Sequence, residues 1–550
     1  MSTSLSEPPL TFFAERFFAA GAAKITTGQA LKSRDKDLWI QCIHAEITQL
    51  INGGTLVAVD DCDIIRGSKI IHSTLQLKVK LYASGLLDKY KARLCACGNE
   101  LAGLVDDTFS PTVGALAYST VLQIAIIDAM KMMTVDTVGA YLHQVYPDDA
   151  PPLYMVLSDN VSLACNLPVG QKYRIKKYLY GLPDAGRAYF KAYSSHLKSK
   201  GYSQTTSDPC LFTKRSASGA VLYAFFHVDD TFVSSTDPAM LSAFLSDVGD
   251  KFKITHSDDI QTYLGIQFAR QPNGDFVLSQ PKLLNSLLDE YSDRLTAHKI
   301  RGVPSPQRSV ASQSKDTTPM DQSAYLHLQG ALIYLTKSRP DIMTAVSFGA
   351  VFSAKPTQGA FTELIHCLKY LQMTQTKGLR LIAGVPSRPL VLKCYVDAGY
   401  LTHADSKSQQ GYCLSFGDHG IFYAKSSKQQ LVATSSTHSE MRALYSLICD
   451  VIYVVHLSSE LYRPIVLPAV LFEDNSAVLS LSLEMTTRVK RCKHFLMLVN
   501  FVRQEVEAGL VLITKVPTED NNADLLTKIL IGSDFVNKAS RLLGEVSSSN

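Results

Sequence analysis

The chain has 550 residues, 46% of them apolar, and is long enough to form several packed cores. Its formal net charge of +4 is too small to indicate a polyanionic partner, so only local clusters of Lys and Arg can do so. The eleven Cys lack metal-ligand spacing, and no uninterrupted apolar run is long enough to cross a membrane. We therefore expect a soluble, multidomain, intracellular protein with reduced thiols and no membrane partner.

The first predicted element is a helix that follows a lead-in without clear periodicity. Residues 1–35 are expected to be this flexible lead-in. The helix is predicted from Lys36 to Asn52, because apolar residues recur at helical spacing and a Gly-Gly pair ends the pattern.

A basic β-hairpin is predicted over residues 69–98, where apolar and polar residues alternate on either side of a Ser-Gly turn. Its polar face carries Lys78, Lys80, Lys91 and Arg93. This face is either solvated or binds phosphate, and the residue pattern leaves both interpretations open.

A short apolar strand then ends in a candidate carboxylate. After a helix-like run over residues 115–133, the strand closes with Asp136, and Gly139-Ala140-Tyr141 turns away from it. An Asp at a strand end is often only a cap or turn residue. Asp136 is also a candidate to join the acidic pair that follows along the chain.

Two apolar runs meet at adjacent carboxylates within Val221–Val233. Their Val, Phe and Tyr content predicts a β-hairpin with Asp229 and Asp230 at its tip. Asp favours turns, so an ordinary acidic loop is one interpretation. The other is a divalent metal site, because adjacent carboxylates beside apolar sequence repel each other unless a cation bridges them. Such a site needs at least one more carboxylate, for which Asp136 is the candidate.

The composition changes near the middle of the chain. A second hairpin is predicted over residues 260–280, and residues 297–322, rich in Ser, Pro, Thr and Gln, form the best linker candidate. Helical segments are predicted over 324–336 and 340–371. A β-rich region then opens at about Leu379.

The β-rich region carries a second set of acids. Asp397 ends a strand-like run, Asp474 follows another, and Asp524 lies in a short segment near the C-terminus. Glu440 begins an amphipathic helix, and it has an ordinary explanation because Thr437-His-Ser-Glu440 fits a capping box. Four acids that each lie at a strand end or a helix start nevertheless favour a metal-binding cluster.

Ten short motifs occur in one order between about Leu38 and Leu530. They are Tyr90-Lys-Ala-Arg-Leu, Thr108-Phe-Ser-Pro111, Asp136-Thr-Val-Gly-Ala-Tyr141, Leu179-Tyr-Gly-Leu182, His227-Val-Asp-Asp230, Tyr263-Leu-Gly-Ile, Tyr334-Leu-Thr-Lys-Ser-Arg-Pro-Asp-Ile342, Ser426-Ser-Lys-Gln-Gln-Leu-Val-Ala-Thr-Ser-Ser-Thr437, Lys493-His494 and Ala523-Asp-Leu-Leu-Thr-Lys528. In this order they resemble the pol segment of copia-type LTR retrotransposons, a reverse transcriptase followed by an RNase H domain. Protease and integrase zinc motifs are missing from the sequence. We therefore expect the downstream part of a pol polyprotein, or a reading frame that has lost its upstream part.

The resemblance implies an α+β multidomain fold. A right-hand polymerase of fingers, palm and thumb would precede an RNase H-like α/β domain. The implied boundaries are 36–295 for fingers and palm (fingers about 36–115, palm about 116–270), 296–322 for the linker, 323–380 for a helical thumb or connection region, 381–535 for the RNase H-like domain and 536–550 for a tail.

The resemblance also assigns the acids to two metal sites. Asp136, Asp229 and Asp230 would be palm carboxylates that hold two Mg²⁺ ions, roughly 3.5 to 4 Å apart, for nucleotide transfer. Carboxylate oxygens suit Mg²⁺ and also accept Mn²⁺. A second pair of ions would serve to cut the RNA strand of an RNA–DNA hybrid. Its ligands would be Asp397, Glu440, Asp474 and Asp524.

Basic and aromatic residues would bind the nucleotide and the nucleic acid. Lys91 and Arg93 would meet the incoming triphosphate, for which a bidentate guanidinium is well suited. Tyr141 would lie under the sugar and exclude a 2′-hydroxyl, while Lys78 and Lys80 would face the nucleic acid. A basic segment is either a contact to the hybrid backbone or a solvated helix start. Its members are Arg488, Lys490, Arg491, Lys493 and His494.

The implied reaction copies retrotransposon RNA into cDNA. The partners would be an RNA template, a DNA or tRNA primer, dNTPs and the RNA–DNA hybrid. The resemblance also allows oligomerisation and association with the integrase and capsid proteins of the element. The location it implies is a cytoplasmic virus-like particle, with the nucleus as a further compartment.

Several positions depart from the family pattern. His227 replaces the usual Tyr or Phe and puts a titratable ring beside the metal site. Asp184 replaces a nucleotide-contacting Gln, and a carboxylate there would repel triphosphate. Asp397-Ala-Gly399 lacks a second Asp, and Tyr400 replaces Trp. All seven metal-binding acids remain, which favours an active divergent element over the alternative, an inactive, degenerate nucleic-acid-binding remnant.

Overall fold

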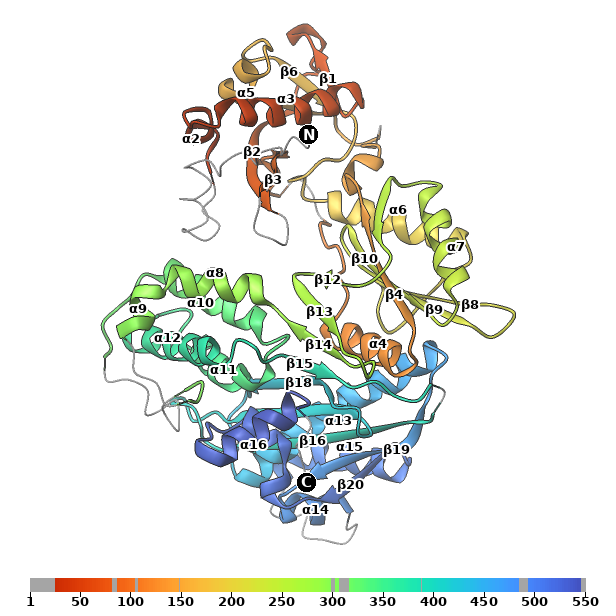
Figure 1. The fold of residues 1–550 in the computed structure, drawn as a ribbon, viewed down its shortest axis with the longest axis vertical. Helices are drawn as coiled ribbons and strands as arrows, with labels where there is room; N and C mark the ends of the chain where they lie inside the picture. The colour runs from red at the N-terminus through yellow and green to blue at the C-terminus, as the bar shows by residue number, and fades with distance from the viewer. Residues whose placement is uncertain are drawn as a thin grey trace, which may run out of the picture.

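A computed structural model describes residues 25–81, 87–103, 107–147, 149–297, 302–305, 316–386, 388–483 and 493–545. Within these residues the chain forms four β-sheets, which Figure 1 shows from the N-terminal sheet at the top to the C-terminal sheet at the bottom. The sheets do not simply follow chain order, because strands from distant parts of the sequence pair with one another.

The N-terminal sheet has the strand order β1-β6-β5-β2-β3. In the long β2–β3 hairpin, Leu75 pairs with Leu94, and both side chains are buried in a core shared with α3. Helix α3 has the predicted bounds, and its buried face includes Trp39. The elements are α2 (Thr27–Leu31), α3 (Lys36–Asn52), β1 (Leu56–Val59), β2 (Lys69–Leu81), β3 (Leu87–Ala96), β5 (Leu153–Val156), α5 (Asp159–Ala164) and β6 (Lys172–Ile175).

The structure differs from two expected boundaries in this region. From Ile25 the expected lead-in is ordered, because Ile25 pairs with Leu77 and a capping box at Thr26 starts helix α2. Residues 153–175, expected in the palm, return to the N-terminal sheet as β5 and β6. β5 pairs in parallel with β2, and a parallel pair needs a long crossover connection, so the N-terminal sheet is not contiguous in sequence.

The central sheet has the strand order β11-β4-β10-β9-β8-β7. Successive residues of β9 face opposite sides, so Phe225 packs in the core shared with α4, whereas Phe226 packs with α6 and α7. The sheet is therefore covered on both faces. Its elements are α4 (Ala115–Ile127), β4 (Lys131–Thr137), α6 (Ala185–Ser199), β7 (Ser203–Gln204), β8 (Leu211–Arg215), β9 (Val221–His227), β10 (Asp230–Ser235), α7 (Pro238–Gly249) and β11 (Ile254–Ser257).

A small sheet and a helical unit follow. The predicted second hairpin forms β13 and β14, and β14 pairs with β15 from a position more than a hundred residues later. The helical unit packs α8 and α10–α12 around one core. The elements are β12 (Thr262–Tyr263), β13 (Ile266–Arg270), β14 (Phe276–Ser279), α8 (Pro281–Glu290), α9 (Ser292–Ala297), α10 (Gln322–Leu335), α11 (Met343–Ala350), α12 (Gln358–Met373) and β15 (Leu379–Leu381).

The helical unit also departs from the expected boundaries. Helices α8 and α9 precede the linker, yet they pack on α10 and α12, so the unit begins near Pro281 rather than at residue 323. Within the expected linker, Val303 is buried and its carbonyl lies 3.0 Å from His366 Nε2 of α12. The single helical stretch expected over 340–371 is divided between a 3-10 turn, α11 and α12.

The C-terminal sheet is mixed, with the order β18-β17-β16-β19-β20. Strands β16, β17 and β18 are antiparallel, whereas β19 and β20 run parallel to β16. One face packs on α13, and the other faces the helical unit. The elements are β16 (Leu390–Gly399), β17 (Gln409–Phe416), β18 (Ile421–Lys428), α13 (Ser436–Glu460), β19 (Ile465–Glu473), α14 (Ser476–Leu483), α15 (Leu496–Glu507), β20 (Val511–Lys515) and α16 (Gly532–Leu542).

Helix α16 crosses the expected boundary between the last domain and a tail. It continues through residue 535 and buries Lys538 and Leu542. Residues 536–542 therefore belong to the C-terminal unit.

The central and C-terminal sheets share one apolar core. Helix α4 contacts both sheets, and Figure 1 shows it above α13 and β18. Arg463 makes a bidentate ion pair with Asp128, at 2.8 and 2.9 Å, and Tyr223 Oη donates to Leu461 O at 2.7 Å. These contacts join the two units through buried groups.

One helix in the described chain, Ser436–Glu460, has the length and hydropathy of a membrane span. This is weak evidence, because 56% of its most apolar window is buried inside the protein against the C-terminal sheet.

Two candidate carboxylate sites

The hairpin site consists of Asp136, Asp229 and Asp230. Strand β10 runs antiparallel between β9 and β4, and its register places Asp230 directly opposite Asp136. Asp229 lies in the two-residue turn, and its carbonyl accepts a hydrogen bond from Thr137 N at 3.0 Å. Its neighbour Val228 has φ of 59°, which is costly for a β-branched residue. The sheet thus brings together the three acids predicted from the sequence.

The three acids of the hairpin site repel one another. Burial and, to a smaller extent, the charges of Asp229 and Asp136 together raise the pKa of Asp230 to about 6. Tyr263 Oη donates to the Asp230 carbonyl at 3.1 Å and ties the second hairpin to the site. A divalent cation would relieve this repulsion, and the oxygen ligands fit Mg²⁺ or Mn²⁺.

Arg93 and Tyr141 lie next to the hairpin site. The Arg93 guanidinium is 3.7 Å from the centre of the Tyr180 ring, and the Tyr180 and Tyr141 rings are 4.9 Å apart. Burial raises the pKa of Tyr141, and Asp229 raises it further. Tyr180 was not predicted as a site residue, although the Leu179-Tyr-Gly-Leu182 motif could have indicated it.

Two lysines of the basic hairpin face each other across its strands. Lys78 and Lys91 are directly opposed, and like charges in this position are destabilising unless an anion compensates them. Lys80 is opposite Lys89 in register, but its side chain lies outside the description. Burial raises the pKa of Glu46, and the charge of nearby Lys91 partly offsets this rise, so a protein carboxylate lies close to the pair and both interpretations of the face stay open.

The two positions that depart from the family pattern have specific surroundings. Asp184 is the residue before α6, and its carboxylate accepts a hydrogen bond from Tyr178 Oη at 3.1 Å. His227 lines a cavity of about 340 Å³ between the central sheet, the second hairpin and β18. Burial lowers the pKa of His227, and the nearby Lys337 lowers it further, so the ring is predominantly neutral near pH 7.

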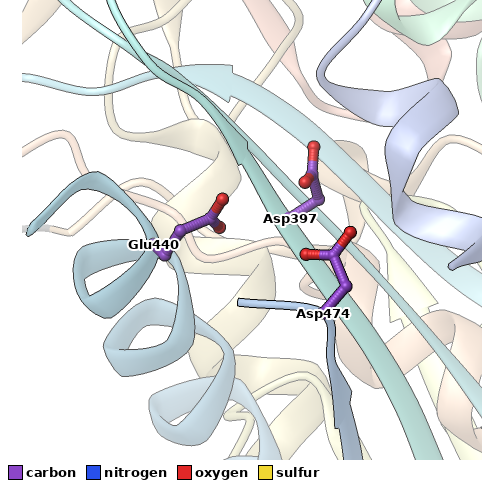
Figure 2. A group of neighbouring side chains, drawn as sticks. All are labelled: Asp397, Glu440 and Asp474. Atoms are coloured by element: carbon purple, nitrogen blue, oxygen red, sulfur yellow. The ribbon is translucent and has the colours of Figure 1, made fainter. Parts of the chain in front are cut away.

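The C-terminal site consists of Asp397, Glu440, Asp474 and Asp524. Asp397 lies near the end of β16, Glu440 in the first turns of α13, and Asp474 directly after β19. Figure 2 shows these three carboxylates pointing toward one another, and each offers an oxygen within 4.8 Å of the other two. Asp136, Asp229 and Asp230 do not form such a group among the described residues, so the ligand oxygens of the hairpin site are more widely separated.

Glu440 does not serve as the helix cap suggested by the sequence. The N-cap is Ser435, whose hydroxyl accepts from His438 N at 3.1 Å. The Oε2 atom of Glu440 is instead buried without a hydrogen-bond partner. Burial raises the pKa of Glu440 well above its usual value, and Asp397, Glu473 and Asp474 add to the rise. An unpartnered oxygen in an acidic cluster fits a cation ligand.

Glu473 is a fifth acid at this site that the sequence interpretation did not select. Its side chain is fully buried at the end of β19, and its Oε2 atom has no hydrogen-bond partner. Its other oxygen accepts from Asn475 N at 2.9 Å. The adjacent Glu473-Asp474 pair was the only signal in the sequence.

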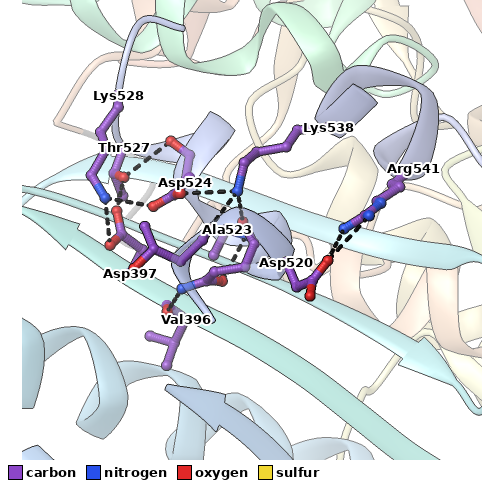
Figure 3. A network of polar contacts seen from close by, with 11 residues as sticks. Val396, Asp397, Asp520, Ala523, Asp524, Thr527, Lys528, Lys538 and Arg541 are labelled. Carbon is purple, nitrogen blue, oxygen red and sulfur yellow. Dashed lines mark hydrogen bonds and ion pairs between the residues drawn. The ribbon is translucent and has the colours of Figure 1, made fainter. Parts of the chain in front are cut away.

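Asp524 is paired with lysines rather than grouped with the other three acids. Its Oδ1 atom is 2.5 Å from Lys528 Nζ, and its Oδ2 atom is 2.9 Å from Lys538 Nζ. Lys528 also lies 3.0 Å from Asp397 Oδ1, and Figure 3 shows it between the two acids. Neither lysine was predicted as a site residue, although Lys528 ends the Ala523–Lys528 motif.

The expected hybrid-binding segment is described only in part. Arg488, Lys490 and Arg491 lie outside the described residues. Lys493 and His494 begin a 3-10 turn before α15, and both are exposed. His494 Nε2 contacts Thr434 Oγ1, which places the ring near the start of α13.

Part of the chain matches a known family model. Residues 62–305 match the family model "Reverse transcriptase (RNA-dependent DNA polymerase)". The chain contains a reverse transcriptase domain. Its homologues are copia-type Pol polyproteins of plant retrotransposons, which confirms the resemblance seen in the motifs.

Three relatives illustrate this homology. The Pol polyprotein from transposon RE1 of Arabidopsis thaliana is 31% identical over 84% of the chain, and that from RE2 of the same plant is 29% identical over 96%. The Pol polyprotein from transposon TNT 1-94 of Nicotiana tabacum is 25% identical over 92%. The chain spans 31%, 35% and 38% of these polyproteins, respectively.

Among solved structures, a foamy viral protease-reverse transcriptase in complex with RNA/DNA hybrid is similar over 86% of the chain and 52% of its own length. The identity is 10% and the TM-score is 0.45. The reverse transcriptase domain of the chain is therefore assigned from sequence similarity.

Proposed function

We propose that the chain is an RNA-directed DNA polymerase with an attached ribonuclease H, which copies retrotransposon RNA into cDNA. The observation that carries the polymerase half is the β4–β10 register, which places Asp136 opposite Asp230. Mg²⁺, or Mn²⁺ in its place, would be held by these acids and Asp229. When bound, a pair of such ions lowers the barrier for attack by a primer 3′-hydroxyl and for departure of pyrophosphate.

The surrounding residues would position the nucleotide. Arg93 stacks on Tyr180, which restricts its rotamers, and its guanidinium would bind the triphosphate. The opposed Lys78 and Lys91 would compensate phosphate charge along the same hairpin face. Tyr141 would lie beneath the sugar. The substrates in this proposal are an RNA template, a DNA or tRNA primer and dNTPs.

The ribonuclease half rests on the close grouping of Asp397, Glu440 and Asp474. Their oxygens would hold a divalent cation that promotes hydrolysis of the RNA strand in an RNA–DNA hybrid. Glu440 contributes an oxygen that the protein leaves unpaired. His494, exposed in the 3-10 turn before α15 and in contact with Thr434 near the start of α13, would face the hybrid backbone.

Primer extension tests the polymerase half. The assay uses an RNA template, a DNA primer, dNTPs and Mg²⁺, and compares the wild type with Asp229→Asn. Asp258→Asn is the matched control, because Asp258 is an exposed acid beside the same sheet. We expect extension by the wild type and the control and none by Asp229→Asn. A wild type that extends no better than Asp229→Asn would establish the inactive remnant instead.

Hybrid cleavage tests the ribonuclease half. A labelled RNA–DNA hybrid is incubated with the wild type, with Asp474→Asn and with Asp418→Asn. The last variant is the control, because Asp418 is an exposed acid of the C-terminal unit. Fragments should appear with the wild type and Asp418→Asn only. Fragment release that persists in Asp474→Asn would remove the ribonuclease assignment.

The remnant remains the second candidate because His227 and Asp184 depart from the family pattern. The contact with Tyr178 Oη directs the Asp184 charge toward a phenol donor, which reduces the expected repulsion of triphosphate. A neutral His227 adds no charge beside the acids. We therefore favour the active enzyme, and primer extension decides between the two.

A further inference from the structure

A lysine lies between two of the four acids of the C-terminal site. Lys528 Nζ is 3.0 Å from Asp397 Oδ1 and 2.5 Å from Asp524 Oδ1, as Figure 3 shows. A divalent cation shared by Asp397 and Asp524 would have to occupy the same space between the two acids as the ammonium group, which also repels it. The ammonium group thus lies where one ion of a four-carboxylate pair is expected.

The second oxygens of these two acids are also engaged. Thr527 Oγ1 donates to Asp397 Oδ2, and Lys538 Nζ lies 2.9 Å from Asp524 Oδ2. Lys538 is held in place because it also donates to Thr518 O at 2.8 Å and to Asn521 O at 2.7 Å. Asp524 therefore has an ammonium partner on each oxygen.

The acids on the other side of the site, in contrast, have an oxygen without a protein partner. Asp397, Glu440 and Asp474 offer oxygens within 4.8 Å of one another, and Glu440 Oε2 is buried without a partner. An Asp397 oxygen that accepts a hydrogen bond keeps a second lone pair for a metal ion. One cation fits here without displacing any protein contact.

We propose that the C-terminal site binds one divalent cation, between Asp397, Glu440 and Asp474, and that the Lys528 ammonium replaces the second. This inference rests on the proposed ribonuclease H site and changes the expectation of two ions there. Lys528 supplies positive charge between Asp397 and Asp524, but an ammonium group does not activate a water molecule as a bound metal ion does. Lys528 acts as a positioning residue: it pairs with Asp397 and Asp524 and so prevents them from binding a second ion.

Of the two lysines, Lys528 is the one that can be substituted with little disturbance of the core. Its side chain is 41% exposed, whereas that of Lys538 is 6% exposed and makes structural hydrogen bonds. Lys528→Met keeps most of the side-chain length and removes the charge. Lys393→Met is the matched control, because Lys393 lies on the same strand as Asp397 but pairs with the exposed Asp418.

The test counts bound Mn²⁺ by electron paramagnetic resonance. All proteins carry Asp229→Asn and Asp230→Asn to remove the hairpin site, and Asp474→Asn in the same background identifies the ions of the C-terminal site. We expect one Mn²⁺ per chain at this site with Lys528 present, two with Lys528→Met, and one with the Lys393→Met control.

Each other result has a distinct meaning. Two ions bound with Lys528 present would overturn the inference, because the second ion would have displaced the lysine. This result does not depend on whether Lys528→Met folds. The inference would also be overturned if the protein with Lys528 and a folded Lys528→Met variant each bound one ion at this site. No Mn²⁺ that depends on Asp474 would overturn the ribonuclease H proposal itself and the inference with it.

Discussion

The hairpin site and the C-terminal site both gather acids at strand ends, but they limit repulsion in different ways. In the hairpin site Asp136 is exposed, and Asp229 and Asp230 are half-buried. In the C-terminal site Asp397 and Asp524 are buried, and two lysines are built in beside them. Water reaches the exposed Asp136 and screens part of the charge at the first site, whereas the buried Asp397 and Asp524 of the second site have lysines as fixed partners. The depth of a site therefore determines how many counterions the protein itself must provide.

The two sites also differ in their backbone. The hairpin site depends on a tight turn in which Val228 has a left-handed conformation. The C-terminal site takes its acids from a strand, the first turns of a helix, one loop position and a 3-10 helix. Backbone strain is thus concentrated at the first site.

The largest expected effect separates the two activities. Asp136→Asn should lower primer extension by roughly 10³-fold, because metal-held charge contributes several kcal/mol to the transition state. Hybrid cleavage by the same variant should stay within about twofold of the wild type, since distant sites behave independently. Asp397→Asn should show the reverse pattern. Loss of both activities in either variant would contradict two separate sites.

The next effect concerns the junction that holds the sites together. Arg463→Ala should lower the free energy of unfolding by about 3 kcal/mol, because it leaves the largely buried Asp128 without its bidentate partner. Thermal unfolding measures the change. The double variant with Asp128→Ala should be more stable than the sum of the single losses predicts. Strict additivity would show that the ion pair does not couple the two units.

A smaller effect tests the nucleotide side of the hairpin site. Arg93→Lys should raise the KM for dNTP roughly tenfold, since one charge-assisted hydrogen bond is worth about 1.5 kcal/mol. Steady-state primer extension at varied dNTP concentration measures this. Arg174→Lys, in the same N-terminal sheet, is the control and should leave KM unchanged. An unchanged KM in Arg93→Lys would place the triphosphate elsewhere.

The smallest effect is a pH dependence of stability in metal-free protein. Asp230 has a pKa of about 6 in the folded state, above its ordinary 3.8, so the folded state favours the protonated form. Stability should therefore fall as pH rises from about 4 to about 6. In EDTA, Asp230→Asn should be more stable than the wild type by about 1 kcal/mol near neutral pH, a value discounted for solvent exposure.

The thermal midpoint measures this difference in stability. At about pH 3 the advantage of Asp230→Asn should vanish, because the wild-type carboxyl is then largely protonated in both states. Asp258→Asn is the control and should show no such trend. An advantage that stays constant with pH would exclude repulsion among the acids as its cause.

Local sequence determined the elements that carry the acids. Helical spacing and the following glycines defined the helix over Lys36–Asn52, and strong β-forming runs defined the strands around Asp229 and Asp230. Motif order determined the family. These features could be predicted because periodicity, turn chemistry and residue type depend on near neighbours in the chain.

Only the tertiary structure decided which acids act together and which are paired with lysines. The partners of Asp524 lie 4 and 14 residues away, and Lys538 reaches it from α16, in the part of the chain expected to be a tail. The return of β5 and β6 to the N-terminal sheet was equally hidden. Such contacts depend on how distant elements pack, and a pattern along one segment carries no information about the side chains that another segment presents to it.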